Sequence, residues 1–286
     1  MAFARHGEGI HDVVKALISQ IHPVFMLPPL AASWFGSMIT SDFSLGVGLL
    51  HMTAIFFAVY TAHVKDGYVD FHIRDEDDDH PLTISGCQIA LLGATVGFMV
   101  SLSLLYFFID IWAVIVTLPT WLIAYHHAPQ LDMHPIGATM GYPTGIGLAV
   151  VGGYYVQIGR IDPIALTFAL VFVVVLTGVK IIDDIKDHQY DRWIGKRTVA
   201  VLLGPNRARR FANIVIGIGL LLLISFVLIG HYPLSIILAT LPIVLVMWIA
   251  RKTTSTVATM LLIRACYVFF AIILGIIYFR PFTGGF

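Results

Sequence analysis

Charged residues and cysteines are scarce in this sequence. Asp, Glu, Lys and Arg together make up 12% of the 286 residues, about half of the share that soluble domains carry. The two cysteines, Cys87 and Cys266, show no CxxC or Cys/His spacing typical of metal binding, so we expect both to be small packing residues. The 17 basic and 17 acidic side chains cancel, which argues against a nucleic-acid partner, since such a partner needs a basic surface.

Hydrophobic residues fill the chain instead. They make up 58% of it, and the mean hydropathy is +0.88, which indicates a membrane protein. Apolar runs long enough to cross a bilayer must be helices, because lipid offers the backbone no hydrogen-bond partner. We therefore predict an all-α, polytopic membrane protein with a single domain over 1–286. About nine transmembrane helices of roughly 20 residues are expected, at 16–38, 45–64, 84–107, 110–126, 136–158, 163–182, 211–230, 233–250 and 257–279.

The distribution of Lys and Arg predicts the orientation of this bundle. With nine spans and the N-terminus inside, nearly all basic residues of the loops fall on the inner side, and only Arg160 and Arg280 fall on the outer side. Because basic residues are retained in short cytoplasmic loops, we predict an integral, multi-pass protein of the cell membrane in this orientation. The first residues lack the pattern of a removable signal peptide, and we expect none.

Most acidic residues gather in two short segments on the predicted inner side. Seven of the 17 lie at 66–79 and four at 183–191, after the second and the sixth predicted spans. On a helix, Asp66 and Asp70 share one face by their i, i+4 spacing, and Asp184, Asp187 and Asp191 share one by their i, i+3, i+7 spacing. The equivalent placement of the two segments predicts an internal repeat of 16–126 and 136–250.

Other charged residues in these segments have plainer interpretations. Asp183 projects away from the shared face of its helix, which favours a surface or helix-end role. Lys180 lies three residues before it and is expected to pair with it. Glu76, Asp78 and Asp79 belong to an acidic run that is typical of a solvated loop.

Facing carboxylates at a membrane surface require a cation. The two acidic faces would repel each other strongly unless a positive charge lay between them. Mg²⁺ suits such a place, because it is usually held by a few carboxylates while substrate phosphates complete its coordination. The pattern therefore predicts a Mg²⁺-bridged diphosphate site. An apolar bundle below this site suits a hydrocarbon tail, so we expect a prenyl diphosphate as substrate.

The second acidic segment resembles that of a known family. "DIKDHQYD", with Asp184, Asp187 and Asp191, followed by "GKRTVAVLLG" at 195–204, is similar to the second Asp-rich motif of the UbiA superfamily of intramembrane prenyltransferases. The resemblance implies a bundle of nine transmembrane helices with Asp-rich motifs after the second and the sixth on the cytoplasmic side. It covers nearly the whole chain in topology.

The first acidic segment departs from the family pattern. In "DGYVDFHIRDEDDDHPLT", Asp70 keeps its place, but Arg74 stands where the last Asp of the motif is expected. Either Asp75 or Asp77 substitutes for it, or this half of the site holds metal with fewer ligands. His80 replaces the Arg of the Arg-Pro-Leu segment that follows the motif in the family.

The resemblance implies Mg²⁺-dependent, electrophilic prenyl transfer. The implied catalytic metal ligands, which would neutralise charge that develops on the diphosphate, are Asp66, Asp70, Asp184, Asp187 and Asp191. The lysines and Arg197 would donate hydrogen bonds to the same oxygens, and two tyrosine rings would face the allylic cation. The implied substrate-binding residues are Lys65, Tyr68, Arg74, Tyr125, Lys196 and Arg197.

Aromatic residues at helix ends leave a second interpretation open. Tyr68 and Tyr125 are equally typical of interfacial anchors, because aromatic belts form at that depth of the membrane. His63, His126 and His127 likewise lie at predicted helix ends, where polar interfacial residues are ordinary.

Two further alternatives concern the function. The acceptor is expected to be lipophilic, with an aromatic quinone precursor favoured over a glycerol-phosphate ether-lipid precursor or another non-aromatic acceptor; oligomeric state and chain length stay open. A cation- or proton-coupled transporter is the alternative of another class, since Pro28, Pro29 and Pro119 interrupt predicted spans and the Gly-rich stretch 141–155 is able to unwind.

Overall fold

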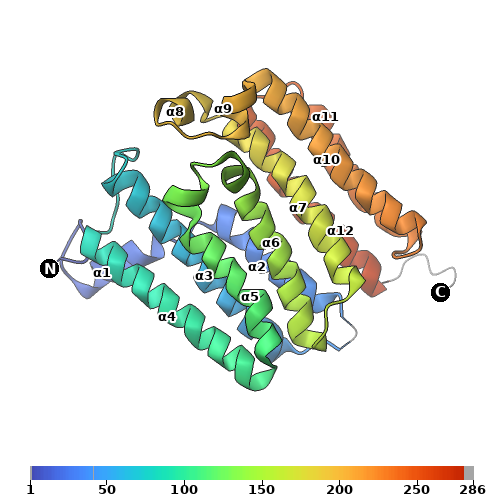
Figure 1. Ribbon diagram of the computed structural model, residues 1–286, viewed down its shortest axis with the longest axis horizontal. Helices are drawn as coiled ribbons and strands as arrows, with labels where there is room; N and C mark the ends of the chain where they lie inside the picture. The colour runs from blue at the N-terminus through green and yellow to red at the C-terminus, as the bar shows by residue number, and fades with distance from the viewer. Residues whose placement is uncertain (1, 41, 280–286) are drawn as a thin grey trace.

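The protein is a bundle of helices. A computed structural model describes residues 2–40 and 42–279, so the predicted outer residue Arg280 lies outside the described part. Within that part no strand is present; the only β-type pairing is an isolated antiparallel bridge between Ala4 and Leu82. The all-α fold class is therefore confirmed (Figure 1).

The helices follow one another with short connections. In chain order they are α1 (Ile10–Ile18), α2 (Pro23–Met38), α3 (Leu45–His72), α4 (Ile84–Phe108), α5 (Ile111–Tyr125), the π-helical turn η1 (His127–Leu131), α6 (Pro135–Ile158), α7 (Pro163–Asp184), α8 (His188–Trp193), α9 (Val199–Leu203), α10 (Pro205–Leu228), the 3₁₀ helix η2 (Leu234–Ala239), α11 (Thr240–Ala250) and α12 (Ser255–Phe279).

Each of the nine predicted spans contains helix, but they differ as candidates for crossing a membrane. Among the described residues, α3, α4, α7, α10 and α12 are long and apolar enough on their own, and α1 with α2 makes a sixth candidate that is bent by 67°. The helices α5 and η2–α11 are apolar but shorter. The multi-pass membrane architecture is thus confirmed, and the count of nine crossings stays a prediction.

Small residues allow the helices to approach closely. A Cβ atom on Gly153 of α6 would overlap the backbone oxygen of Ser33 on α2, and one on Gly36 would overlap that of Val150. The hydroxyl of Ser37 donates to the carbonyl of Gly153 across the same contact, at 3.0 Å. Such close crossings are typical of membrane bundles, in which association depends on packing rather than on the hydrophobic effect.

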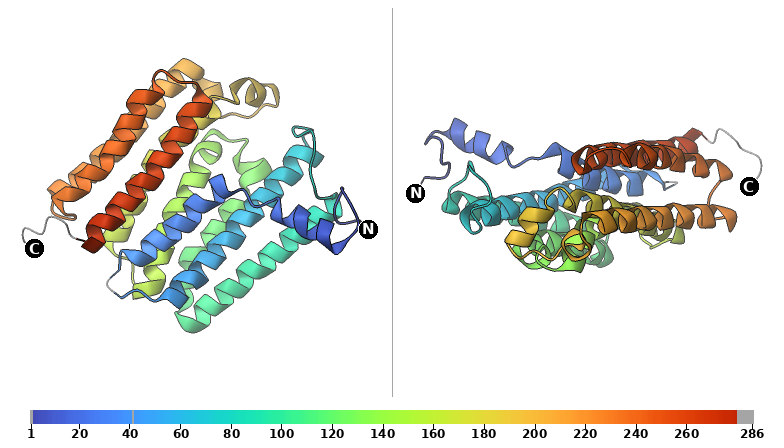
Figure 2. Two further views of the ribbon diagram at one scale, coloured as in Figure 1. Left: turned by 180° about the vertical axis from the view of Figure 1, so that it is seen from behind. Right: turned by 90° about the horizontal axis from the view of Figure 1, so that it is seen from above.

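The helices form two layers. In Figure 2, α2 and α12 lie on one face of the molecule, and α6, α7 and α10 lie on the other. An aromatic cluster joins the layers at the centre: the ring of Phe35 on α2 lies 5.2 to 5.3 Å from those of Phe168 and Phe172 on α7 and Phe270 on α12. Phe35, Phe168 and Phe172 are almost fully buried.

The Gly-rich stretch of the fifth predicted span, which the transporter alternative would have unwound, is helical. The Gly-rich stretch lies within α6, a helix that runs from Pro135 to Ile158. Pro28 and Pro29 are inside α2, and Pro119 is inside α5. The helices accommodate these prolines because neighbouring helices surround them. In the described residues the fifth predicted span is thus a continuous helix, and the one bent candidate span is the pair α1–α2.

The two acidic segments lie at the same end of the bundle. The C-terminal end of α3 and the loop after it, the turn η1, and the short helices α8 and α9 all cluster at one end of the long helices (Figure 1). Since α3 and α7 both end there, at His72 and Asp184, the fold brings together segments that are more than 100 residues apart in the sequence.

Candidate active site

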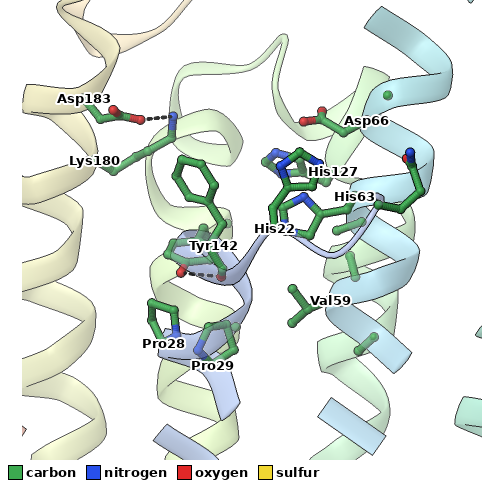
Figure 3. A pocket seen from close by; sticks show the side chains of 18 of the residues that line it. His22, Pro28, Pro29, Val59, His63, Asp66, His127, Tyr142, Lys180 and Asp183 are labelled. Atoms are coloured by element: carbon green, nitrogen blue, oxygen red, sulfur yellow. Dashed lines mark hydrogen bonds and ion pairs between the residues drawn. The ribbon is translucent and has the colours of Figure 1, made fainter. Parts of the chain in front are cut away.

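A cavity of about 690 Å³ lies between the two layers at this end of the bundle. Helices α2, α3, α5, α6, α7 and α12 contribute to its wall. The wall is mostly apolar in its deeper part, where it includes Pro29, Val59, Leu176 and Phe270. Figure 3 shows the polar end, where Asp66 on α3 and Asp183 on α7 lie on opposite sides of the space.

The first acidic segment reaches the cavity as predicted. Asp66 and Asp70 both line it, because they are one helical turn apart on α3. Of the two substitutes considered for the missing last Asp, Asp77 lines the cavity, whereas Asp75 is exposed and has a left-handed backbone with φ of 56°. Asp79, expected to be solvated, also borders the cavity and pairs with Arg5 at 2.9 Å.

The second acidic segment differs from the prediction in its backbone. Helix α7 ends at Asp184 and α8 begins at His188, so no continuous helix places Asp184, Asp187 and Asp191 on one face. Asp184 and Asp191 are nevertheless buried, while Asp187 is exposed. Asp183, predicted to point away from the site, lines the cavity. The helical extrapolation failed because the chain turns at 185–187.

Lysines compensate the carboxylates of the second segment. The Nζ atom of Lys180 lies 2.5 Å from Oδ1 of Asp184 and 3.7 Å from Asp183, as helical spacing predicts. Lys186 contacts Asp183 at 2.8 Å and Asp187 at 3.9 Å. Three carboxylates thus share two ammonium groups, one of which, Lys180, also lines the cavity.

A second ionic network joins three loops. Arg74 binds Asp132 at 2.6 Å and Asp70 at 3.1 Å. Lys196 lies 3.8 Å from the same Asp132 oxygen and 4.0 Å from Asp191. The first acidic segment, the loop after α5 and the α8–α9 connection are therefore coupled through Asp132, a buried residue that the sequence analysis missed.

Glu76 is a second acidic residue whose role the sequence did not indicate. Its carboxylate lies 3.7 Å from the Nζ atom of Lys196 and is half-buried, so it is not part of a solvated loop. The signal available for both missed acids was weak: each is a carboxylate in a loop predicted to lie on the inner side of the membrane.

Buried oxygens without hydrogen-bond partners test whether this site suits a cation. Among the described residues, Oδ2 of Asp184 and Oδ1 of Asp132 are both inaccessible and without a hydrogen bond. An unpaired buried carboxylate oxygen is costly, and it is also a ready ligand for a hard divalent ion. The donor set of this region consists of carboxylates, which fits Mg²⁺ better than it fits a soft metal.

Burial also changes the acidity of Asp191. Its burial raises the pKa from 3.8 to about 6, although Lys196 opposes this shift. The cause is desolvation, which disfavours the charged form of a carboxyl group. Near neutral pH the group is largely ionised, so it meets the requirement of a metal ligand.

None of the six predicted substrate-binding residues lines the cavity; Lys196, the sixth, belongs to the ionic network described above. The Nζ atom of Lys65 lies 4.0 Å from the ring centroid of Tyr125 and donates to its carbonyl at 3.3 Å, so these two residues contact each other. Tyr68 packs against the cluster formed by α1, α3 and α4, with His72 at 5.7 Å. Arg197 is exposed. Arg74 is bound to two carboxylates, as described above.

Four imidazoles line the cavity instead: that of His80, in the loop after α3, and three others. The three others come from the link before α2 (His22), from α3 (His63) and from η1 (His127). The rings of His22 and His63 are stacked, with centroids 5.1 Å apart, and Figure 3 shows all three on the side of Asp66. From the sequence, His63 and His127 were expected to be ordinary interfacial residues; their position in the cavity depends on tertiary packing.

A model of the UbiA prenyltransferase family matches residues 84–273. The chain belongs to this family. The match begins after the first acidic segment, so membership does not depend on the irregular stretch at 66–79, and the predicted family resemblance is confirmed. The protein is therefore a prenyltransferase. No curated protein matches the sequence.

Solved structures support the fold of this family member. A UbiA homologue from Aeropyrum pernix K1 superposes with a TM-score of 0.73 at 17% identity, over 89% of this chain and 98% of that one. A digeranylgeranylglyceryl phosphate synthase matches with a TM-score of 0.71 at 16% identity, over 92% and 97%. A UbiA homologue from Archaeoglobus fulgidus, bound to GPP and Mg²⁺, matches with 0.70 at 15% identity, over 93% and 99%.

Proposed function

We propose that this UbiA family member transfers a prenyl group from a polyprenyl diphosphate to a lipophilic acceptor in a Mg²⁺-dependent reaction. One observation carries the proposal: a single cavity joins a carboxylate-rich end to a long apolar wall. This combination fits an amphiphile whose head requires a divalent ion and whose tail requires a dry pocket. The bundle lies in the cell membrane, with this end facing the cytoplasm.

Carboxylates of both acidic segments would hold the ion. Bound Mg²⁺ supplies Lewis-acid stabilisation of the charge on the leaving diphosphate. The proposed ligands are Asp66 and Asp70, which line the cavity, and three residues of the second segment outside its lining, Asp184, Asp187 and Asp191. Asp183 joins them as a candidate because it lines the cavity.

Residues of the chain then bind and protect the reacting groups. Lys180 at the cavity wall, and Lys196 in the second ionic network, would donate hydrogen bonds to diphosphate oxygens. The apolar wall would exclude water, which would otherwise capture the allylic cation. Alkylation of a C–H or O–H nucleophile releases a proton, and the imidazoles of His22, His63 and His127 face the same space as acceptors for it.

An aromatic quinone precursor is the acceptor that we favour. Lys180 is the only Lys or Arg among the described residues that line the cavity, and it is already paired with Asp184. A second anionic headgroup beside the diphosphate would therefore lack a cationic partner. A glycerol-phosphate acceptor is the other candidate, because a digeranylgeranylglyceryl phosphate synthase shares the fold.

Calorimetry of the purified protein tests the diphosphate site. We expect geranylgeranyl diphosphate to bind in the presence of Mg²⁺ and to bind at least tenfold more weakly in its absence. Asp70→Asn and Asp184→Asn should abolish the Mg²⁺ dependence. Asp78→Asn, a change of an exposed carboxylate in the same acidic run, should leave it intact.

Each outcome of the binding experiment leads to a different conclusion. If prenyl diphosphates of several lengths fail to bind to folded protein, the proposed Mg²⁺-dependent prenyl-diphosphate site is wrong. If they bind, incubation with 4-hydroxybenzoate or with geranylgeranylglyceryl phosphate, followed by mass spectrometry of the products, decides between the two acceptor classes.

A further inference from the structure

A second group of metal-ligating side chains lies beside the active-site cavity. His72 at the end of α3, His80 in the following loop and Cys87 in the first turn of α4 each place one ligand atom within 4.8 Å of the other two. Among the described residues no other group of three His, Cys or acidic side chains meets this distance. His80 and Cys87 are buried, and His72 is half-buried.

The distances resemble the edges of a tetrahedral metal site. The Sγ atom of Cys87 lies 3.9 Å from Nδ1 of His80. The carbonyl oxygen of Leu82 lies 3.2 Å from that nitrogen and 3.1 Å from Nε2 of His72. With zinc bond lengths of about 2.0 Å to nitrogen and about 2.3 Å to sulfur, ligand atoms are separated by roughly 3.3 to 3.6 Å. The edge between Cys87 and His80 exceeds this range by a few tenths of an ångström, and the ligand atom of His72 lies within 4.8 Å of the other two.

The tautomer of His80 is set by its other ring nitrogen. Nε2 lies 3.3 Å from Oε1 of the buried Gln20, an oxygen that can only accept. With the proton of His80 on Nε2, Nδ1 is an acceptor: it accepts the backbone N–H of Leu82 at 3.3 Å and lies 3.9 Å from the Sγ atom of Cys87. When a histidine binds a metal through one ring nitrogen, the other ring nitrogen usually donates a hydrogen bond to an acceptor, which fixes the orientation of the ring.

The tertiary structure brings these three side chains together, and their spacing in the sequence does not indicate a metal site. The three residues are separated by seven and six others and follow no known metal-binding pattern. They meet because the loop 73–83 returns the chain to the end of α3, where Leu82 also bridges to Ala4 of the N-terminal segment. The ring of Phe71 stacks on that of His80 at 5.9 Å and limits its rotation.

We propose that His72, His80 and Cys87 form a structural site for a borderline-soft divalent ion, best matched by Zn²⁺. Nitrogen and thiolate ligands select such an ion, whereas the carboxylate region selects Mg²⁺. The bound ion links the loop 73–83, through His80, to the end of α3 and the start of α4. Because this loop carries Asp77 and Asp79 to the cavity, the ion fixes the border of the prenyl-diphosphate site without taking part in the chemistry.

The experiment uses Co²⁺ as a spectroscopic probe of the purified, full-length protein. Excess Mg²⁺ is included to occupy the carboxylate region. We expect one equivalent of Co²⁺ to produce a thiolate-to-metal charge-transfer band, which only a cysteine ligand gives, and Zn²⁺ to displace the Co²⁺ and remove the band. Equilibrium dialysis against Zn²⁺ should give one bound ion per chain under the same conditions.

Three variants identify the ligands. Cys87→Ser should abolish the band, while Cys266→Ser, a change of the only other cysteine and equally a buried thiol, should retain it. His72→Gln should weaken Zn²⁺ binding at least tenfold, and this variant serves if Cys87→Ser does not fold.

Several outcomes would overturn the proposal. They are the absence of a band in folded wild-type protein, a band that persists in Cys87→Ser, a band lost in Cys266→Ser but not in Cys87→Ser, and unchanged Zn²⁺ affinity in His72→Gln. Because the readout is metal binding in the presence of Mg²⁺, it is independent of whether prenyl diphosphate binds.

Discussion

At the scale of single residues, Lys196 is the cation on which most of the polar network depends. Its Nζ atom lies within 4.0 Å of Glu76, Asp132 and Asp191, which come from three different segments. Asp132 and Asp191 are buried, so they depend on a nearby positive charge more than exposed carboxylates do.

Replacing this lysine tests whether a divalent ion shares its role. Lys196→Met should lower the free energy of unfolding of the metal-free protein by roughly 1 to 3 kcal/mol, below the range for a close buried pair because the distances are long. Mg²⁺ should restore more stability to this variant than to the wild type. Thermal unfolding with and without Mg²⁺ measures both effects, with the exposed Lys252→Met as the matched control. Equal Mg²⁺ shifts in all three proteins would separate Lys196 from the metal region.

The acidity of Asp191 predicts a pH dependence. Because burial raises its pKa from 3.8 to about 6, the metal-free folded state favours the protonated form. This contribution to stability is fully present below about pH 4 and is lost as the pH rises through about 6. Mg²⁺ requires the ionised form, so its stabilising effect should appear over the same range.

Melting temperatures between pH 5 and 8 measure this prediction. In the absence of Mg²⁺, wild-type protein should lose stability relative to Asp191→Asn as the pH increases through 6. With Mg²⁺, the wild type should regain it above pH 6 and the variant should not. A difference between the two proteins that is constant over the whole pH range would show that Asp191 does not titrate there.

Single residues also show which parts of the candidate site could be predicted from the sequence alone. Asp66 and Asp70 were placed correctly because both lie on one helix, and a helix has a fixed periodicity. Asp183 was misplaced because the periodicity was extended through a turn at 185–187. Asp132 and His22 were missed because their positions depend on contacts between segments that no local pattern records.

At the scale of helices, the crossing of α2 and α6 is the contact most sensitive to volume. Gly153 allows the backbone of α6 to lie against Ser33 of α2. Gly153→Ala should lower stability by about 1 to 3 kcal/mol, because the added methyl group must displace backbone rather than a flexible side chain. Gly217→Ala on α10, where no atom lies within 4 Å of the added carbon, should not lower it. Thermal unfolding in detergent compares the two, and equal losses would mean that the crossing is not tightly packed.

Helix types were easier to predict than their relation to the membrane. Apolar runs of the right length specified helices at all nine predicted ranges, because lipid excludes other backbone structure. The same composition did not distinguish a full crossing from the bent pair α1–α2 or from the shorter α5. Tilt and bending depend on packing against neighbours, which composition does not contain. The predicted internal repeat likewise stays a prediction.

At the scale of the whole molecule, the orientation in the membrane is the last prediction to test. Asp78 lies in the loop before α4, and Arg160 lies between α6 and α7, so three predicted spans separate them. Asp78→Cys should react with a membrane-impermeant maleimide only in inside-out vesicles, and Arg160→Cys only in right-side-out ones. The reason is that basic residues retain the loop that contains Asp78 on the cytoplasmic side. Cys87 and Cys266 are buried, so the wild type gives the background in both preparations. Labelling of both variants from the same side would require an even number of crossings between them, and labelling with the sides exchanged would place the active-site end outside.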